Sequence, residues 1–447
     1  MKQVQLAIIG GGPAGLSAAY YLATRGYKPT VFEKSARPGG MMTYGIPSFK
    51  LEKTIIDAEI QVLRELGVEI RCGVEVGRDV TIPQLREQGF LAFYIAIGCQ
   101  GGRLPGVPGE HAAGTDIAVH FLHEALADEN QHMDGRVVVI GGGNVAVDCA
   151  RTAVRFGAEA VSMVCLESRD TMPASKDEIA EAEEEHIEIH TGWGPKELLQ
   201  DESGHVTAVV FKKCLRTIDP ETGKFAPVYD EAETITLPAD HVVFAIGQAI
   251  EWGGLLKDTK VTFHRGNYPV ADPLTYQTAE ADIFVGGDVY HGPKFVIDAI
   301  EEGKCAAESL HRYVHKGASL TIGRNRRDFV MLDKENFSVN CYDHATRQTE
   351  AVDPAVEAHS FRDARKTLTS EQVQTETARC LGCGASWVDP NKCIGCGVCT
   401  TKCVFDAIHL KRDHPECSTM MKAEDKLKGI ASMACKRLGQ TLRGRKG

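Results

Sequence analysis

Short runs of consecutive apolar residues alternate with helix-spaced apolar positions along the first two thirds of the chain. Residues 4–10 form one such run, residues 13–25 repeat apolar positions at helical spacing, and residues 28–33 are predicted to form a second strand. Uninterrupted apolar strands are typical of parallel sheets, which helices cover on both faces. The pattern therefore predicts a strand–helix–strand unit at the beginning of the chain.

The same pattern restarts at residue 136. Strands are predicted at 137–140 and 160–166, with a helix at 146–156 between them. Later segments predict a β-hairpin at 206–212 and 225–236, apolar strands at 241–248 and 282–288, and a long helix at 296–313. Two such units predict an α/β fold with two Rossmann-like dinucleotide-binding domains.

A glycine-rich turn joins the first strand to its helix. Residues 10–15 read Gly-Gly-Gly-Pro-Ala-Gly, which matches G-x-G-x-x-G. Gly10 permits the tight turn, Gly12 lets a pyrophosphate approach the backbone, and Gly15 lets the helix and strand pack closely. Glu33 ends the second strand, where an acid bonds the ribose hydroxyls. The helix N-terminus favours the phosphate charge, so we expect a dinucleotide here.

A second glycine turn follows the strand at 137–140. It reads Gly141-Gly142-Gly143-Asn144-Val145-Ala146, and the same phosphate argument applies. At the end of the next strand, Glu167 is suited to the free 2′-hydroxyl of NAD and would repel a 2′-phosphate. Arg169 could instead clamp that phosphate. NADH and NADPH both stay open, and the sequence favours NADH.

Composition narrows the class of protein. The 447 residues are 43% apolar and 25% charged, which is ordinary for a globular protein, and the net charge of −11 does not favour nucleic-acid binding. No run of 18 apolar residues predicts a membrane span, and no signal peptide is visible. We expect a cytoplasmic protein.

The cysteines are unevenly distributed. Nine of the fifteen lie between Cys341 and Cys435. Residues 393–403 have the spacing C-x2-C-x2-C-x3-C, which is the bacterial iron–sulfur pattern. The predicted metal ligands are Cys380, Cys383, Cys393, Cys396, Cys399, Cys403 and Cys417.

The number of 4Fe-4S clusters stays open. In two-cluster ferredoxins the fourth cysteine of the run ligates the other cube. Cys403, Cys380 and Cys383 would then belong to a second cube, with Cys417, Cys435 or Cys341 completing the set. One cube with idle cysteines is the alternative, and a zinc site is another.

Taken together, these motifs resemble the glutamate synthase small-subunit family, whose relatives include the large subunit of ferredoxin:NADP transhydrogenase and part of dihydropyrimidine dehydrogenase. The resemblance covers residues 4–315. It rests on Gly10–Gly15, Arg37–Gly40, Tyr44-Gly45-Ile46-Pro47, Gly141–Ala146 with Asp148, Met172-Pro173-Ala174, Gly286-Gly287-Asp288 and Glu302-Gly303-Lys304.

The resemblance implies FAD at the first site, where Asp288 would bond the flavin ribityl chain, and a nicotinamide cofactor at the second. The family often has Tyr-Arg-Arg where this chain has Cys165-Leu166-Glu167, so the nucleotide preference is not carried over. No cysteine pair follows the first strand–helix–strand unit, so we expect no electron transfer to a dithiol. The predicted cofactor-binding residues are Gly10, Gly12, Pro13, Ala14, Gly15, Glu33, Lys34, Gly40, Gly45, Ile46, Gly98, Gly287, Asp288, Val296, Gly141, Gly143, Asn144, Val145, Glu167, Arg169 and Gly247.

The predicted domains follow from the motifs. An FAD-binding domain is expected at 1–110 and 270–318, a NAD(P)-binding domain at 111–269, and a linker or partner-docking segment at 319–377. A ferredoxin-like 4Fe-4S domain is expected at 378–415 and a basic tail at 416–447.

These features predict an NAD(P)H-linked oxidoreductase that passes electrons between nicotinamide, FAD and 4Fe-4S clusters. No catalytic side chain is predicted, because the flavin carries the chemistry. The expected partners are other redox subunits and ferredoxin, in a larger complex that could bifurcate electrons. A glutamate synthase small subunit and a non-catalytic scaffold with structural nucleotides are the alternatives.

Overall fold

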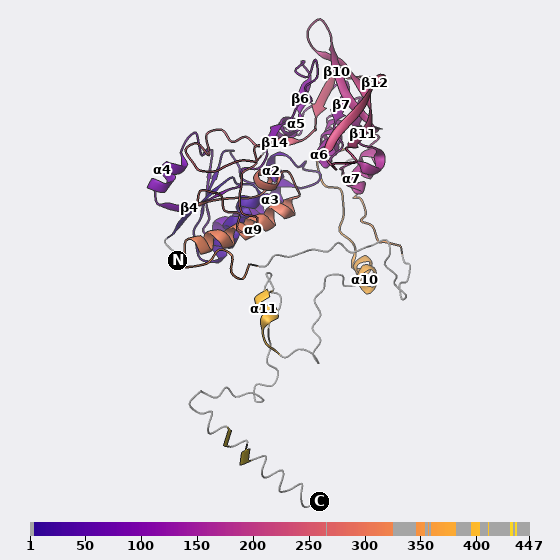
Figure 1. Cartoon of the computed structure of the whole chain (residues 1–447). Coiled ribbons are helices and arrows are strands. Elements are labelled where there is room, and N and C mark those ends of the chain that lie inside the picture. The colour runs from indigo at the N-terminus through magenta and orange to yellow at the C-terminus, as the bar shows by residue number, and fades with distance from the viewer. Residues whose placement is uncertain are drawn as a thin grey trace, which may run out of the picture. The chain divides into compact units, whose positions relative to one another are not determined.

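The computed structural model describes residues 4–264, 266–324, 346–353, 356, 359–380, 395–402, 410, 430–431 and 434–435 (Figure 1). The chain divides into two compact units. The larger comprises Met1–Arg326 and His344–Glu376, and the smaller comprises Arg327–Asp343 and Thr377–Gly447.

The first sheet of the larger unit is built from five parallel strands in the order β15-β4-β1-β2-β3. Leu6 and Ile8 of β1 join one hydrophobic cluster, and Ala7 and Ile9 join another on the opposite face. Both faces are therefore covered, which explains the uninterrupted apolar run. The strands are β1 (Gln5–Ile9), β2 (Thr30–Glu33), β3 (Glu69–Cys72), β4 (Phe90–Ile95) and β15 (Ile283–Val285).

The second sheet repeats this arrangement with five parallel strands in the order β6-β13-β7-β8-β9. Val137 and Val139 of β7 face one cluster, and Val138 and Ile140 face the other. The strands are β6 (Thr115–Ile117), β7 (Arg136–Ile140), β8 (Ala160–Cys165), β9 (Glu188–Thr191) and β13 (His241–Phe244). We call the parts of the larger unit built on these sheets the first-sheet half and the second-sheet half.

Helices pack on the two sheets. In the first-sheet half these are α1 (Pro13–Thr24), α2 (Met41–Tyr44), α3 (Lys53–Glu65), α4 (Ile82–Glu87), α8 (Asp288–His291) and α9 (Val296–Tyr313). In the second-sheet half they are α5 (Ala118–Ala127), α6 (Asn144–Arg155), the 3-10 turn η1 (Arg169–Thr171) and α7 (Lys176–Glu184). The long helix predicted at 296–313 has those bounds in the structure. None of the helices in the described part of the chain combines the length and apolar character needed to cross a membrane.

The expected hairpin is part of a larger antiparallel sheet. β11 (Val206–Ile218) pairs with β12 (Phe225–Pro238) and also with β10 (Trp193–Gln200), which the sequence pattern did not indicate. Residues 219–223 form the turn of this hairpin, and the Asp219 amide donates to the Lys224 carbonyl across it (2.9 Å). A short pair of strands, β5 (Gly101–Gly102) and β14 (Gln248–Ala249), completes the larger unit.

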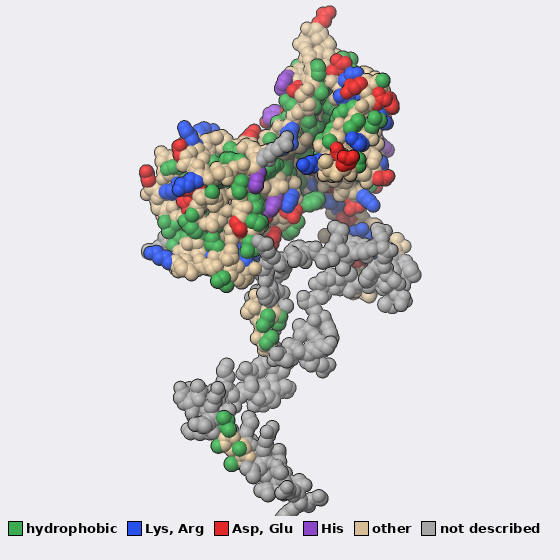
Figure 2. All heavy atoms as spheres, in the orientation of Figure 1, with side chains coloured by type: hydrophobic (Ala, Val, Ile, Leu, Met, Phe, Trp, Pro, Cys, Tyr) green, Lys and Arg blue, Asp and Glu red, His purple; other side chains and the backbone are tan. Residues whose placement is uncertain are grey.

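Two further helices follow. α10 (Ser370–Ala378) ends just before Cys380, and α11 (Val398–Lys402) lies in the smaller unit. Figure 2 shows acidic and basic side chains interspersed over this face of the larger unit, in accord with a chain of moderate net negative charge.

Candidate functional site

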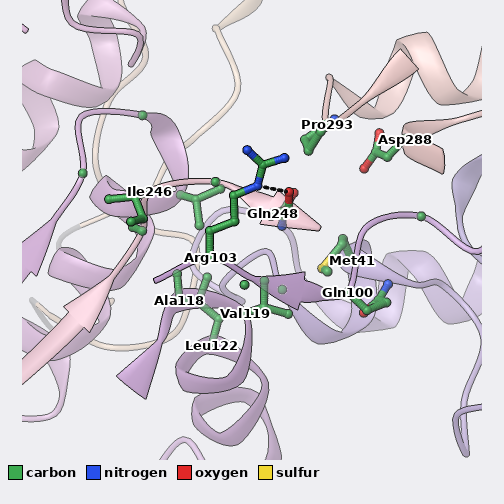
Figure 3. Close-up of a pocket in the computed structure, with 18 of the residues that line it drawn as sticks. Met41, Gln100, Arg103, Ala118, Val119, Leu122, Ile246, Gln248, Asp288 and Pro293 are labelled. Atoms are coloured by element: carbon green, nitrogen blue, oxygen red, sulfur yellow. Dashed lines mark hydrogen bonds between the residues drawn. The ribbon is translucent and has the colours of Figure 1, made fainter. Parts of the chain in front are cut away.

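Both glycine turns open on one cavity of about 1280 Å³ in the larger unit. Its walls come from the carboxyl ends of the strands in both sheets, where parallel α/β sheets bind ligands. Figure 3 shows Arg103 among the lining side chains, with its Nε donating to the Gln248 carbonyl (3.1 Å). The cavity therefore connects the two predicted nucleotide sites without an intervening wall.

The first glycine turn is tightly constrained. A Cβ on Gly10, whose φ is +106°, would lie 2.3 Å from the Ala96 carbonyl oxygen, and one on Gly15 would lie 2.0 Å from the Gly10 carbonyl oxygen. By contrast, a Cβ on Gly12 would meet nothing closer than 3.8 Å, and Gly12 lines the cavity. Gly12 also caps α1, so the open space lies at a helix N-terminus suited to a pyrophosphate.

Glu33 is buried and held by the turn around it. Its carboxylate accepts hydrogen bonds from the amides of Gly11 (2.7 Å) and Ser35 (2.8 Å). Each carboxylate oxygen keeps a further lone pair. Glu33 lines the cavity, so these residues fit the ribose of a dinucleotide.

The second acidic group of this half lies after β15. Gly287 has φ +72° and precedes Asp288, which lines the cavity. Burial raises the pKa of Asp288 to about 6. Glu302 of α9 fixes the turn, accepting from the Gly287 amide (2.5 Å) and contacting His291 Nδ1 (2.5 Å). The turn is thus tied to the helix whose first residue, Val296, also lines the cavity.

The second glycine turn repeats the geometry of the first. A Cβ on Gly142 would lie 3.1 Å from Glu167 Oε2, while one on Gly143 would meet nothing within 4 Å. Gly143 caps α6, and the Asn144 side chain accepts from the Ser175 amide (2.9 Å). The open space at this helix N-terminus fits the pyrophosphate of a second dinucleotide.

The two halves meet at a charged group on the cavity wall. Lys50 of the first-sheet half donates to Asp148 of α6 (2.7 Å) and also pairs with Glu178 of α7. Burial raises the pKa of Asp148 to about 6, and the Lys50 ammonium opposes that shift. The sequence pattern gave no signal for Lys50, because the pairing joins residues almost 100 positions apart.

Most of the predicted cofactor-binding residues converge on this cavity. Gly15 and Arg169 do not line it. Gly15 is buried where α1 packs on β1, and Arg169 pairs with Glu183 (2.5 Å). The residues brought together are Gly10, Gly12, Pro13, Ala14, Glu33, Lys34, Gly40, Gly45, Ile46, Gly98, Gly141, Gly143, Asn144, Val145, Glu167, Gly247, Gly287, Asp288 and Val296.

The antiparallel sheet adds a wall that the sequence reasoning missed. Trp193 of β10, Lys212 of β11, and Phe225 and Tyr229 of β12 line the cavity on the side of Glu167. Lys212 pairs with Glu231 (2.7 Å), and its Nζ lies 4.4 Å from the Tyr229 ring centroid. The aromatic residues of the predicted hairpin were the available signal.

Three of the seven predicted metal ligands fall in the described part of the chain. Cys380 and Cys396 are exposed, and Cys399 is half-buried at the start of α11. Gly395 and Gly397 have φ of +67° and +80°, a backbone form that lets a short loop wrap around a cube. These free thiols fit a cluster, although no three metal-ligating side chains meet among the described residues. Cys383, Cys393, Cys403 and Cys417 lie outside those residues.

Comparison with known proteins decides the family. Residues 4–303 match the model of the pyridine nucleotide-disulphide oxidoreductases, and residues 386–409 match the 4Fe-4S binding domain. The chain belongs to the pyridine nucleotide-disulphide oxidoreductase family. Members of this family bind FAD and NAD(P)H, and the second match adds a 4Fe-4S centre. The predicted fold class and cofactors are therefore confirmed, as is the class of enzyme, an NAD(P)H-dependent flavoprotein oxidoreductase.

Two relatives in sequence are named as subunits of larger enzymes. The chain is 36% identical over 388 residues to the NADP(+)-dependent formate dehydrogenase subunit beta of Moorella thermoacetica, covering 85% of this chain and 54% of that protein. It is 36% identical over 327 residues to the glutamate synthase [NADPH] small chain of Halomonas elongata, covering 69% of this chain and 68% of that protein. The chain thus spans about half the length of the first relative. The predicted resemblance to glutamate synthase small subunits is confirmed.

A solved structure shows the same fold. Mycobacterium tuberculosis FprA in complex with NADPH matches with a TM-score of 0.59 at 18% identity, covering 70% of this chain and 85% of that chain. In the present protein, residues 41–71 contain no cysteine, and Met41 of α2 lines the cavity. No cysteine pair therefore follows the first strand–helix–strand unit.

Proposed function

We propose that this protein is the electron-transferring subunit of a larger redox complex and that it exchanges a hydride with NADH in preference to NADPH. The observation that carries the proposal is the single cavity onto which both glycine turns open. FAD, when bound there, accepts a hydride from a reduced nicotinamide and yields electrons singly to iron–sulfur centres.

The chain's own residues bind and orient the two nucleotides. Gly12 and Gly143 leave room for the pyrophosphates at the starts of α1 and α6. Glu33 and Glu167 line the cavity beside these turns, and we assign them to the riboses; Asp288 lines it at the turn that precedes α9. The strands behind the turns are buried and apolar, and they form a fixed support for both turns.

The preference for NADH is argued from Glu167. Two unit charges 4 Å apart repel by about 4 kcal/mol at an effective dielectric of 20, so a 2′-phosphate beside Glu167 is disfavoured. Two cations that could offset this repulsion are already paired. Arg169 pairs with Glu183 and Lys212 with Glu231. The two relatives described above are named for NADP, so this preference would distinguish the present chain from them.

Anaerobic stopped-flow reduction tests both parts of the proposal. We expect NADH to bleach the flavin absorbance, with a value of kcat/KM at least about tenfold above that for NADPH. Failure of both nucleotides to bleach the flavin would support the scaffold alternative. A clear preference for NADPH would contradict the role assigned to Glu167.

We further propose that the clusters pass electrons to or from partner subunits or a ferredoxin. The free thiols of all the described cysteines support a reducing, cytoplasmic location. Iron and sulfide analysis of anaerobically purified protein should give four or eight of each per chain, whereas zinc without labile sulfide would contradict a cluster.

A glutamate synthase small subunit is the second candidate, favoured by the 36% identity to that small chain. Isolation of the native complex separates the candidates. Co-purification with a large amidotransferase-type chain would identify the second, and redox subunits without such a chain would support the first.

A further inference from the structure

Residues 359–366, here called the strap, lie across the junction between the two halves of the larger unit. At the centre of the junction is the ring of Phe361. Its centroid is 6.2 Å from that of Phe49 in the first-sheet half and 5.5 Å from that of Phe156 in the second-sheet half. Phe49 and Phe156 are both buried. The strap therefore supplies the middle ring of a group of three.

Polar contacts hold the strap to both sides of Phe361. The Arg155 guanidinium donates from Nε to the Ser360 carbonyl (3.0 Å) and lies 3.7 Å from the Phe49 ring centroid. On the other side, Arg362 pairs with Glu52 (3.0 Å). Each half of the larger unit therefore contacts the strap through one aromatic ring and one charged side chain.

The strap is also connected to the cavity wall. Arg365 donates from Nη2 to the Lys50 carbonyl (3.4 Å), and the Lys50 ammonium donates to Asp148 (2.7 Å). Lys50 and Asp148 both line the cavity. A shift of the strap would therefore move the group that joins the two halves beside the nucleotide sites.

Relative motion is the usual expectation for two domains of one chain unless the interface between them is large and apolar. Hydride transfer requires the reacting atoms to be about 3–3.5 Å apart, and a misplacement of about 1 Å can cost about 100-fold in rate. We propose that the strap is a positioning element, in which Phe361 sets the placement of the second-sheet half on the first so that the nicotinamide meets the flavin. This inference rests on the proposed function.

The test is the variant Phe361→Ala in the full chain. We expect the limiting rate of flavin reduction by NADH to fall about tenfold or more, while the NADH Kd from the same stopped-flow series changes by less than about twofold. The long-wavelength charge-transfer absorbance of the nicotinamide–flavin contact should weaken in parallel. Phe361→Tyr, which keeps the ring, should restore both signals.

Two further variants make the result interpretable. Leu215→Ala removes an exposed apolar side chain from β11 and should leave rate and absorbance unchanged. If Phe361→Ala does not fold, Arg365→Ala removes the contact to Lys50 and should give the same split between rate and Kd. An unchanged reduction rate and charge-transfer absorbance in Phe361→Ala would overturn the proposal. A fall in rate that is fully explained by loss of bound FAD would also overturn it.

A readout without nucleotide separates this proposal from the proposed function. Hydrogen exchange of the backbone amides at 49–52 and 148–156 should be faster in Phe361→Ala than in the wild type. If NADH and NADPH both fail to reduce the wild type, the proposed function fails. Unchanged exchange at both sets of amides would overturn the strap's role whatever the reduction result.

Discussion

The two glycine turns of the larger unit have the same geometry, but their acids differ. Glu33 accepts hydrogen bonds from two backbone amides of its own turn. Glu167 approaches Gly142 at the equivalent place, and among the described residues its carboxylate has no hydrogen-bond donor. An acid fixed in advance favours a nucleotide that stays bound, whereas an acid held less tightly suits one that exchanges. The comparison agrees with a resident FAD and a nicotinamide substrate.

The largest effect is expected from a substitution in the first glycine turn, which should act on FAD, compared with one in the second, which should act on the nicotinamide nucleotide. In Gly10→Ala the new Cβ would lie 2.3 Å from the Ala96 carbonyl oxygen at φ +106°, so we expect loss of FAD and of its absorbance bands, while the absorbance of the iron–sulfur centre remains. In Gly143→Ala the Cβ meets nothing within 4 Å of protein, so FAD should remain and only the nicotinamide nucleotide should bind more weakly. Absorbance spectra and NADH titration measure these outcomes. Full FAD content in Gly10→Ala would contradict the assignment.

Substitution of Glu167, the acid of the second turn, should change the preference between NADH and NADPH. In Glu167→Gln the negative charge that disfavours a 2′-phosphate is removed, so the ratio of kcat/KM for NADPH to that for NADH should rise about tenfold to 100-fold. Glu33→Gln is the matched control, which should weaken FAD binding without changing the ratio. An unchanged ratio in Glu167→Gln would show that Glu167 does not contact the ribose.

Each half contains a carboxyl group with a raised pKa. We expect these groups to make the free energy of unfolding depend on pH, which is a smaller effect than the two above. Because burial raises the pKa of Asp148 to about 6, the folded state binds more protons than the unfolded state between about pH 4 and pH 6. The contribution of Asp148 to stability therefore falls by about 3 kcal/mol as the pH rises through this window.

The variant Asp148→Asn lacks this titration. Its unfolding temperature relative to the wild type, followed by tryptophan fluorescence, should rise as the pH increases from 4.5 to 7. Asp288 has a similar raised pKa, and its own titration should persist in the variant. A difference between the two proteins that does not depend on pH would contradict this expectation.

The smallest effect on nucleotide preference is expected from substitution of Arg169. Its guanidinium pairs with Glu183 and does not line the cavity. Exposed ion pairs contribute about 0–1 kcal/mol. Arg169→Ala should therefore change the NADPH to NADH ratio by less than about threefold in steady-state assays. A large loss of NADPH use would show that the side chain swings to the 2′-phosphate.

Local patterns predicted the parts of the fold that depend on neighbouring residues. The apolar run at 4–10, the turn at 10–15 and the helix at 296–313 each carry their signal within a few positions of the sequence. β10 gave no such signal, because its strand contains Gly194 and Pro195 and is defined by its pairing with β11.

The junction between the halves could not be predicted for a different reason. Phe49, Phe156 and Phe361 are each ordinary apolar residues in sequence, and only the folded chain brings them together. The pairing of Arg169 with Glu183 likewise depends on where α7 packs. Contacts between distant segments lie outside what hydrophobic spacing can indicate.

An anaerobic titration with NADH followed by EPR tests the central claim most directly. We predict that NADH bleaches the flavin and that a cluster signal then appears, because the chain joins a hydride acceptor to one-electron centres. Clusters that stay EPR-silent with NADH but are reduced by dithionite would contradict the account.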